Sequence, residues 1–312
     1  MNALYCPARA KLNLVLRIVG RRADGYHLLE TLFHTLDLHD DLWLARRASG
    51  CELEVRAEQA HLLVPGGPDN LVVRALQRLV EAAGCGHGFA ALLHKRIPHG
   101  GGLGGGSSDA AAALRLANHL LDRPLDDLAL HRVAVSLGAD VPFFLRGGSQ
   151  WGRGIGDELE PAEVPPLHFV LVLPPFGCPT VDVYKNHAAL WIGGPPQVSV
   201  SFVTVPNNRD SAVRIGFRND LEPAAERVRP ALAVLRQRVA DLGHSAVRMT
   251  GSGSTLFVAF AEAAAAEQCA RDLGKLRDEG VRLVVTRSAM PQLDALQPAP
   301  WPVPGESGGT LV

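Results

Sequence analysis

A glycine-rich segment carries the residue types that bind phosphate. It reads P-H-G-G-G-L-G-G-G-S-S-D-A-A-A-A-L, from Pro98 to Leu114. Its six glycines let the backbone approach an anion closely, in conformations that other residues resist. The Ala-rich run that follows predicts a helix whose free N–H groups and positive dipole end would face that anion. A flexible linker would not lie between an apolar strand and such a helix. We therefore assign phosphate binding to Pro98, Gly100, Gly101, Gly102, Leu103, Gly104, Gly105, Gly106, Ser107 and Ser108, with Ser107 also able to reach a magnesium ion.

Two better-known phosphate motifs do not fit this segment. Gly100, Gly102 and Gly105 match the dinucleotide fingerprint, but that fold places an acidic residue after a second strand about 20 residues on. Here Asp122 stands in L-L-D-R-P-L, which is typical of a helix end and a turn. No G-x-x-x-x-G-K-[ST] sequence occurs, so a Walker loop is excluded.

A second glycine loop, M-T-G-S-G-S-T-L-F, runs from Met249 to Phe257 between two predicted strands. Gly251 and Gly253 could form a second wall of a binding site. A tight hairpin turn would use the same residues. The residues alone leave both interpretations open.

A lysine and an aspartate have suitable settings for acid–base chemistry. Alternation from Ala10 to Val19 predicts a strand that places Lys11 and Asn13 on one face. Asp140 follows a predicted helix end and precedes Val141-Pro142, where proline restricts the backbone. A solvated strand lysine and an ordinary turn aspartate are the alternative interpretations.

These side chains need a scaffold of mixed helices and strands. Because they do not alternate strictly as βαβ units, we expect an α+β fold with domains over 1–160 and 161–290. The tail, 291–312, contains five prolines and little apolar periodicity, which predicts disorder. Further strands are expected over 33–38, 41–44, 89–97, 168–173, 246–250, 255–260 and 281–287. Helices are expected over 70–83, 107–121, 128–137, 180–191, 224–242 and 261–279, and the second of them should be capped by Ser107, Ser108 or Asp109. A loop is expected over 193–210.

The composition excludes several classes of protein. The chain has 312 residues, a net charge of −1 and 47% hydrophobic residues, so no basic surplus attracts nucleic acid. Its five cysteines are dispersed and its histidines lack metal-ligand spacing, which argues against disulfides or structural zinc and favours the cytoplasm. No apolar run approaches a signal peptide or a membrane span.

Three segments together resemble the GHMP kinases, a superfamily of small-molecule kinases. They are P-A-R-A-K-L-N-L near the N-terminus, the P-x-G-G-G-L-G-G-G-S-S-D loop and the T-G-S-G-S loop, in the same order and spacing. D-G-Y-H at Asp24–His27, L-G-A-D-V-P-F-F at Leu137–Phe144 and P-T-V-D-V-Y at Pro179–Tyr184 are similar to the branch of this superfamily that acts on a cytidine diphosphate derivative of methylerythritol. The resemblance covers residue 5 to about residue 288.

The resemblance implies a ribosomal S5 domain 2-like N-terminal domain and a ferredoxin-like C-terminal domain. It implies ATP with magnesium, and phosphorylation of the 2-hydroxyl of the erythritol moiety in the non-mevalonate isoprenoid pathway. Lys11 and Asp140 would be catalytic, and we expect a monomer or weak dimer with no nucleic acid or membrane partner. Substrate contacts are expected from Asn13, Tyr26, His27, Asp140, Thr180, Tyr184, Gly251 and Ser252.

Tyr26 and Tyr184 could sandwich the base, and the family histidine that His27 matches contacts cytosine. Tyr184 stands where the family often has Phe, and the tail has no counterpart to align. Thr180 could instead cap a helix. A nucleotide-binding regulator without turnover, an NAD oxidoreductase and a homoserine or mevalonate-type kinase are the alternative functions.

Overall fold

The large sheet carries the first half of the chain and the phosphate loop. The computed structural model describes residues 2–59, 62–190, 200–207, 211–289 and 296–302. Within them, a nine-stranded sheet has the order β3-β4-β2-β1-β9-β8, with β13 joined to β1 and the β5–β6 pair joined to β2. Its strands are β1 Asn2–Arg21, β2 His27–Arg47, β3 Cys51–Ala57, β4 Gly88–Lys95, β5 Ser149–Arg153, β6 Glu158–Pro161, β8 Ser201–Asn207, β9 Ser211–Asn219 and β13 Gln297–Pro300.

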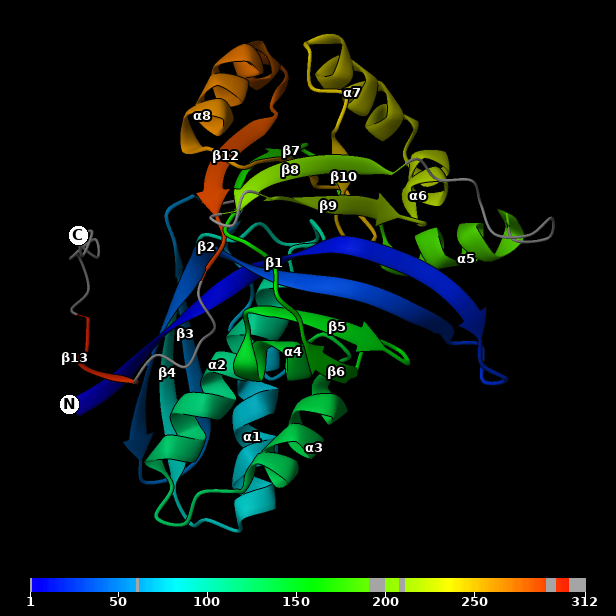
Figure 1. Cartoon of the computed structure of the whole chain (residues 1–312). Coiled ribbons are helices and arrows are strands. Elements are labelled where there is room, and N and C mark those ends of the chain that lie inside the picture. Colours follow the sequence, from blue (N-terminus) through cyan, green and yellow to red (C-terminus); the bar gives the residue numbers. More distant parts are fainter. Residues whose placement is uncertain (1, 60–61, 191–199, 208–210, 290–295, 303–312) are drawn as a thin grey trace.

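Four helices cover one face of this sheet. They lie together below it in Figure 1, and their apolar side chains form one core with those of β1, β2 and β4. α1 begins and ends as predicted, because the Asn70 side chain accepts a hydrogen bond from the Val72 N–H and Gly84 ends the helix with left-handed φ. The helices are α1 Leu71–Ala83, α2 Gly105–Leu120, α3 Asp127–Leu137 and α4 Val141–Arg146.

The predicted cap of the second helix is wrong. α2 begins at Gly105, and the residue before it, Gly104, has φ 72° and makes no side-chain cap. Ser107, Ser108 and Asp109 all lie inside the first turns. Because a glycine supplies the left-handed entry, the helix starts within the glycine loop and brings its first N–H groups to the loop's inner surface.

A small antiparallel sheet, with the order β10-β11-β7-β12, forms the other half of the molecule. Figure 1 shows α7 and α8 beside it, at the end opposite α1 to α3. Val170, Val172 and Val258 of this sheet pack in one core with these helices. Its elements are β7 His168–Leu173, α5 Thr180–Leu190, α6 Glu222–Val228, α7 Pro230–Asp241, β10 Arg248–Met249, β11 Leu256–Phe260, α8 Ala263–Asp272, a 3-10 helix Gly274–Glu279 and β12 Arg282–Arg287.

Two predicted helices are divided. The 224–242 helix breaks at Arg229, which has φ −135° and ψ 86°, because a residue before proline is pushed out of the helical region. The 261–279 helix ends at Asp272 and continues as 3-10 turns. The predicted α+β architecture is confirmed. The break at Arg229 follows from the proline that comes after it.

The hairpin of β8 and β9 was not predicted. The loop expected over 193–210 is wrong for 201–207, and 193–199 and 208–210 lie outside the described residues. β9 runs parallel to β1, with Val15 opposite Arg218 and Leu16 opposite Asn219. Because this strand returns to the first sheet, a domain boundary near residue 160 stays a prediction.

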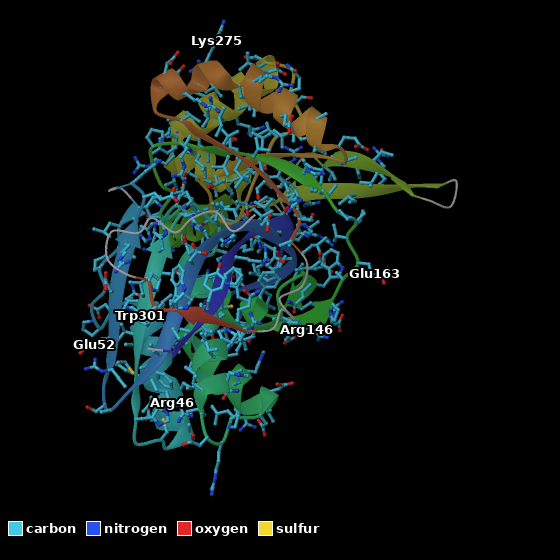
Figure 2. All side chains as sticks on the ribbon, turned by 90° about the vertical axis from the view of Figure 1, so that its left-hand side faces the viewer. Arg46, Glu52, Arg146, Glu163, Lys275 and Trp301 are labelled. Atoms are coloured by element: carbon cyan, nitrogen blue, oxygen red, sulfur yellow. The ribbon has the colours of Figure 1, made fainter. Side chains whose placement is uncertain are left out.

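The C-terminal tail is ordered in part. β13 pairs antiparallel with the start of β1, from Asn2 opposite Pro300 to Tyr5 opposite Gln297, and Trp301 follows it (Figure 2). Leu296 packs against the first core. The prediction of disorder is wrong for this segment, because prolines are tolerated on an edge strand; residues 291–295 and 303–312 lie outside the described part. None of the helices in the described ranges is long and apolar enough to cross a membrane.

Candidate active site

A cavity of about 730 Å³ lies where the two halves meet at β1. Its walls come from β1, the β1–β2 turn, the glycine loop, the start of α4, α5 and the β10–β11 loop. The structure thus brings together residues up to 241 positions apart in the sequence, from Lys11 to Ser252. The predicted site residues that line it are Lys11, Asn13, Tyr26, His27, Gly102, Gly104, Ser107, Asp140, Thr180, Tyr184, Gly251 and Ser252.

The remaining residues of the glycine loop lie outside this wall. They are Pro98, Gly100, Gly101, Leu103, Gly105, Gly106 and Ser108. Leu103 is buried, and its carbonyl accepts a hydrogen bond of 3.0 Å from the Lys11 N–H. The loop is therefore fixed to the strand that carries the lysine, and only part of it faces the cavity.

Lys11 and Asp140 meet at the floor of the cavity. Lys11 Nζ lies 3.4 Å from Asp140 Oδ2 and donates to Asn13 Oδ1 at 2.5 Å. It also lies 5.4 Å from the centre of the Phe33 ring. The lysine side chain is only 4% exposed, whereas that of Asp140 is 35% exposed. A buried cation thus contacts a carboxylate that remains open to a ligand.

The local backbone leaves the Asp140 carboxylate available. Asp140 precedes α4 with φ −82° and ψ −16°, and its side chain does not cap the helix. Pro142 lies in the first turn of α4, where a missing N–H costs nothing. The predicted restriction of the backbone before proline is wrong, because Val141 is the first residue of a helix that was not predicted.

The two glycine loops touch through their backbones. A Cβ on Gly102 would lie 2.5 Å from the Thr250 carbonyl oxygen, and one on Gly251 would lie 3.2 Å from the Gly102 oxygen. The Thr255 N–H donates to the Gly101 carbonyl at 3.3 Å. The second loop joins antiparallel strands β10 and β11 and also lines the cavity. The segment is therefore both a hairpin turn and a wall of the cavity, so the two interpretations of its sequence are compatible.

Gly104 is required by packing as well as by its backbone angle. A Cβ there would lie 2.8 Å from Phe144 Cζ and 3.1 Å from Lys11 Cγ. Any larger residue would therefore displace the lysine.

An aromatic group forms the opposite end of the cavity. The His27 ring centre lies 5.1 Å from that of Tyr184 and 5.8 Å from that of His187. Burial, together with the charge of Arg21, lowers the pKa of His27, which favours the neutral ring. Burial and the nearby Asp140 raise the pKa of Tyr184. Tyr26 lines the same cavity but is 64% exposed.

Thr180 and three other polar residues complete the site. The Thr180 hydroxyl is 2.9 Å from that of Ser252, which joins α5 to the second glycine loop. Arg21 lines the cavity, and Thr31 and Thr250 hydrogen-bond to Asn13. These last three residues were not predicted from the sequence. Arg21 lies three residues before Asp24 of D-G-Y-H, and Thr250 begins the T-G-S-G-S loop, so both could have been found from those motifs, whereas Thr31 carries no comparable signal.

Two family models match the chain. GHMP kinases N terminal domain matches residues 70–148, and GHMP kinases C terminal matches residues 207–277. These ranges contain the two glycine loops and most of the helices that pack around them. The fold and the site define an ATP-dependent GHMP kinase.

Individual relatives narrow this class. A 4-diphosphocytidyl-2-C-methyl-D-erythritol kinase of Halorhodospira halophila is 42% identical over 270 residues, covering 83% of this chain and 86% of the relative. That of Xanthomonas campestris pv. campestris is 40% identical over 294 residues, covering 93% and 94%. The chain belongs to the family of the 4-diphosphocytidyl-2-C-methyl-D-erythritol kinases.

Solved structures agree with the fold. A crystal structure of a 4-(cytidine 5'-diphospho)-2C-methyl-D-erythritol kinase has a TM-score of 0.71 and 34% identity, and covers 92% of this chain and 99% of that one. A homoserine kinase from Cytophaga hutchinsonii has a TM-score of 0.64 at 18% identity, covering 94% and 96%. The second match indicates the shared fold alone.

Proposed function

We propose that this protein transfers the γ-phosphate of ATP to the 2-hydroxyl of 4-diphosphocytidyl-2-C-methyl-D-erythritol, a step of the non-mevalonate route to isoprenoid precursors. The observation that carries this proposal is the Lys11–Asp140 pair at 3.4 Å, in a cavity bounded by both glycine loops. The extensive similarity to kinases named for this substrate supports it.

Asp140 would act as the general base. Its exposed carboxylate takes the proton of the substrate hydroxyl as the oxygen forms a bond to the γ-phosphorus and the bond to the ADP oxygen breaks. The Lys11 ammonium stabilises negative charge near the attacking oxygen. Both groups are held by rigid elements, β1 and the start of α4, which suits a reaction that depends on positioning.

Magnesium would enter with the nucleotide. Among the described residues, no group of three His, Cys, Asp or Glu side chains could hold a metal ion by itself. The Ser108 hydroxyl is buried without a hydrogen-bond partner in the described part of the chain, and Ser107 lines the cavity. These hydroxyls, with phosphate oxygens, suit a hard cation that keeps few protein ligands, and the ion would neutralise phosphate charge.

Base recognition would lie at the aromatic end. His27 can read the edge of the cytosine, where an amine replaces the carbonyl of uracil, whereas stacking on Tyr26 or Tyr184 cannot distinguish the two bases. Arg21 could contact the diphosphate, because guanidinium groups bind phosphate oxygens well.

A substrate panel with ATP, scored by ADP release, tests the proposed reaction. We expect turnover with the cytidine diphosphate methylerythritol and none with homoserine or mevalonate. Turnover with homoserine or mevalonate in preference would contradict the proposal, and absence of any ADP release would favour a nucleotide-binding regulator.

Variants of His27 and Tyr26 test the choice of base. His27→Ala should raise KM for the cytidine substrate and narrow the preference over a uridine analogue, since a lost hydrogen bond in a buried site is worth about 1–3 kcal/mol. Tyr26→Phe should lower kcat/KM only slightly, and Tyr26→Ala should weaken the binding of both substrates to the same extent. The measurement is kcat/KM for both analogues. A full cytidine preference in His27→Ala would place base recognition elsewhere.

A further inference from the structure

A continuous chain of hydrogen bonds leads from a backbone carbonyl of β1 to the ammonium of Lys11. The Thr31 hydroxyl donates to the Val15 carbonyl at 2.7 Å, and Asn13 Nδ2 donates to Thr31 Oγ1 at 2.8 Å. Lys11 Nζ then donates to Asn13 Oδ1 at 2.5 Å. Thr31 lies on β2, the neighbour of β1, and is not among the residues that line the cavity.

The chemistry of the groups determines the direction of every bond. A carbonyl only accepts, so the single hydrogen of the Thr31 hydroxyl is used in the bond to Val15. The Thr31 oxygen must then accept, and its partner on Asn13 must be the NH₂ group. An ammonium only donates, so it requires the amide oxygen of Asn13. The two ends of the chain therefore select the same orientation of the amide.

Because the three side chains are buried, water cannot replace a hydrogen bond that is lost between them. Thr31 is 0% exposed, and Asn13 and Lys11 are each 3% exposed. The Asn13 N–H donates to Thr250 Oγ1 at 2.9 Å, which holds its backbone but not its amide rotation. Without the Thr31 hydroxyl, the buried NH₂ group of Asn13 loses its acceptor, and the ammonium alone still selects the orientation of the amide. Because a buried donor without an acceptor is costly, the amide would shift toward another partner and away from its place beside the ammonium.

We propose that Thr31 is a positioning residue for phosphoryl transfer: its hydroxyl anchors the Asn13 amide, which in turn holds the Lys11 ammonium beside Asp140. The inference rests on the proposed function of Lys11 and Asp140 but does not depend on which acceptor alcohol is phosphorylated. Because Thr31 does not line the cavity, its effect should fall on kcat rather than on the binding of either substrate.

The test compares Thr31→Val with a matched control. Thr35→Val removes a hydroxyl from the same strand, at a residue that is also 0% exposed and whose hydroxyl bonds the carbonyl and the N–H of Gly148. Thr31→Ser keeps the hydroxyl, and Thr31→Ala provides a second variant without it should the valine fail to fold. For each we would measure kcat, KM for ATP and acceptor, and the melting temperature.

We expect kcat to fall about tenfold in Thr31→Val and Thr31→Ala, the size of one buried hydrogen bond, with both KM values within about twofold. Thr31→Ser should restore kcat, and Thr35→Val should change the melting temperature without lowering kcat. A folded Thr31→Val enzyme with nearly wild-type kcat would overturn the proposal, as would an equal loss in Thr35→Val.

The wild-type enzyme separates this inference from the proposed function. If it phosphorylates a different acceptor from the panel, the substrate assignment fails, and the Thr31 comparison is run on that acceptor with the same expected outcome. If it phosphorylates the cytidine substrate and Thr31→Val is fully active, the positioning role alone fails.

Discussion

Two clusters of lysine and carboxylate lie on either side of the phosphate loop, and they differ in access to solvent. In the cavity, Lys11 meets Asp140 at 3.4 Å, and the carboxylate side chain is 35% exposed. Behind the loop, Lys95 contacts Asp40 and lies 2.7 Å from Asp109, with both carboxylates at most 4% exposed. We propose that the same residue types serve proton transfer in the open pair and stabilise the fold in the sealed cluster.

The sealed cluster contains two carboxyls and one ammonium. Asp40 accepts hydrogen bonds from Lys95 and from the N–H groups of Arg96 and Ile97. Asp109 Oδ1 has no hydrogen-bond partner in the described part of the chain. Burial raises the pKa of Asp109 to about 8, even though Lys95 opposes this, which favours its protonated form at neutral pH.

Both clusters act on the same loop. Lys95 Nζ would lie 3.4 Å from a Cβ on Gly105, the first residue of α2, and Asp109 lies on that helix. On the other side of the loop, the backbone N–H of Lys11 donates a hydrogen bond to the Leu103 carbonyl. Solvent access, more than residue type, therefore separates the proposed catalytic ion pair from the structural one.

The largest effect should come from removing the sealed cation. Lys95→Met leaves buried carboxyls without their ammonium and should lower the free energy of unfolding by about 3–5 kcal/mol. Lys11→Met should lower it by only about 1 kcal/mol, because the exposed Asp140 keeps its contact with water. Urea denaturation measures both. Equal losses would mean that the two clusters do not differ as described.

The next effect should be on catalysis alone. Asp140→Asn should lower kcat by roughly 100-fold or more, because it removes the general base, while the Kd for ATP and the melting temperature stay near wild type. The matched variant Asp109→Asn should keep most of the activity. Near wild-type turnover in purified Asp140→Asn would remove this residue from the mechanism.

The pH dependence of stability should identify the sealed cluster. Because the pKa of Asp109 is higher in the folded state than the unfolded value of 3.8, folding takes up a proton between pH 4 and 8. Its contribution to stability is present below pH 4 and is lost as pH rises through about 8, with a slope of at most about 1.4 kcal/mol per pH unit. Unfolding free energy is measured against pH for the wild type and for Asp109→Asn, and the difference between the two curves isolates the contribution of Asp109. Identical curves would contradict the raised pKa of Asp109.

The smallest effect should be on nucleotide affinity. Gly106 is exposed in the first turn of α2, and a Cβ there meets only Leu71 Cδ1, at 3.7 Å. Gly106→Ala should therefore fold, yet weaken ATP binding by about 1 kcal/mol, roughly fivefold in Kd, by obstructing one N–H contact. Gly104→Val is a poorer test, because its clash with Phe144 would disturb the fold. Unchanged affinity by calorimetry would show that phosphate does not approach this turn.

Local patterns were enough to locate the main elements and both glycine loops. The alternation around Lys11, the helix that follows Gly104 and the caps of α1 depend on nearest neighbours in the chain, so they could be predicted. The hairpin of β8 and β9 was not predicted, although β9 alternates apolar and other residues at Val213, Ile215 and Phe217 and so carries a strand signal. The strand β13 could not be predicted, because it is short, contains two prolines and is ordered by pairing with β1.

By itself, the sequence determined which residue types could do the chemistry: a glycine loop for phosphate, a lysine on a strand and an aspartate before a proline. Only the tertiary structure decided which lysine meets an exposed carboxylate in the cavity, because Lys11 and Lys95 both stand in strands, are both buried and both meet aspartates. It also placed Thr31 behind Asn13. Hydrogen-bond direction and solvent access depend on which side chains surround a group in space, and residues far apart in the sequence supply that environment.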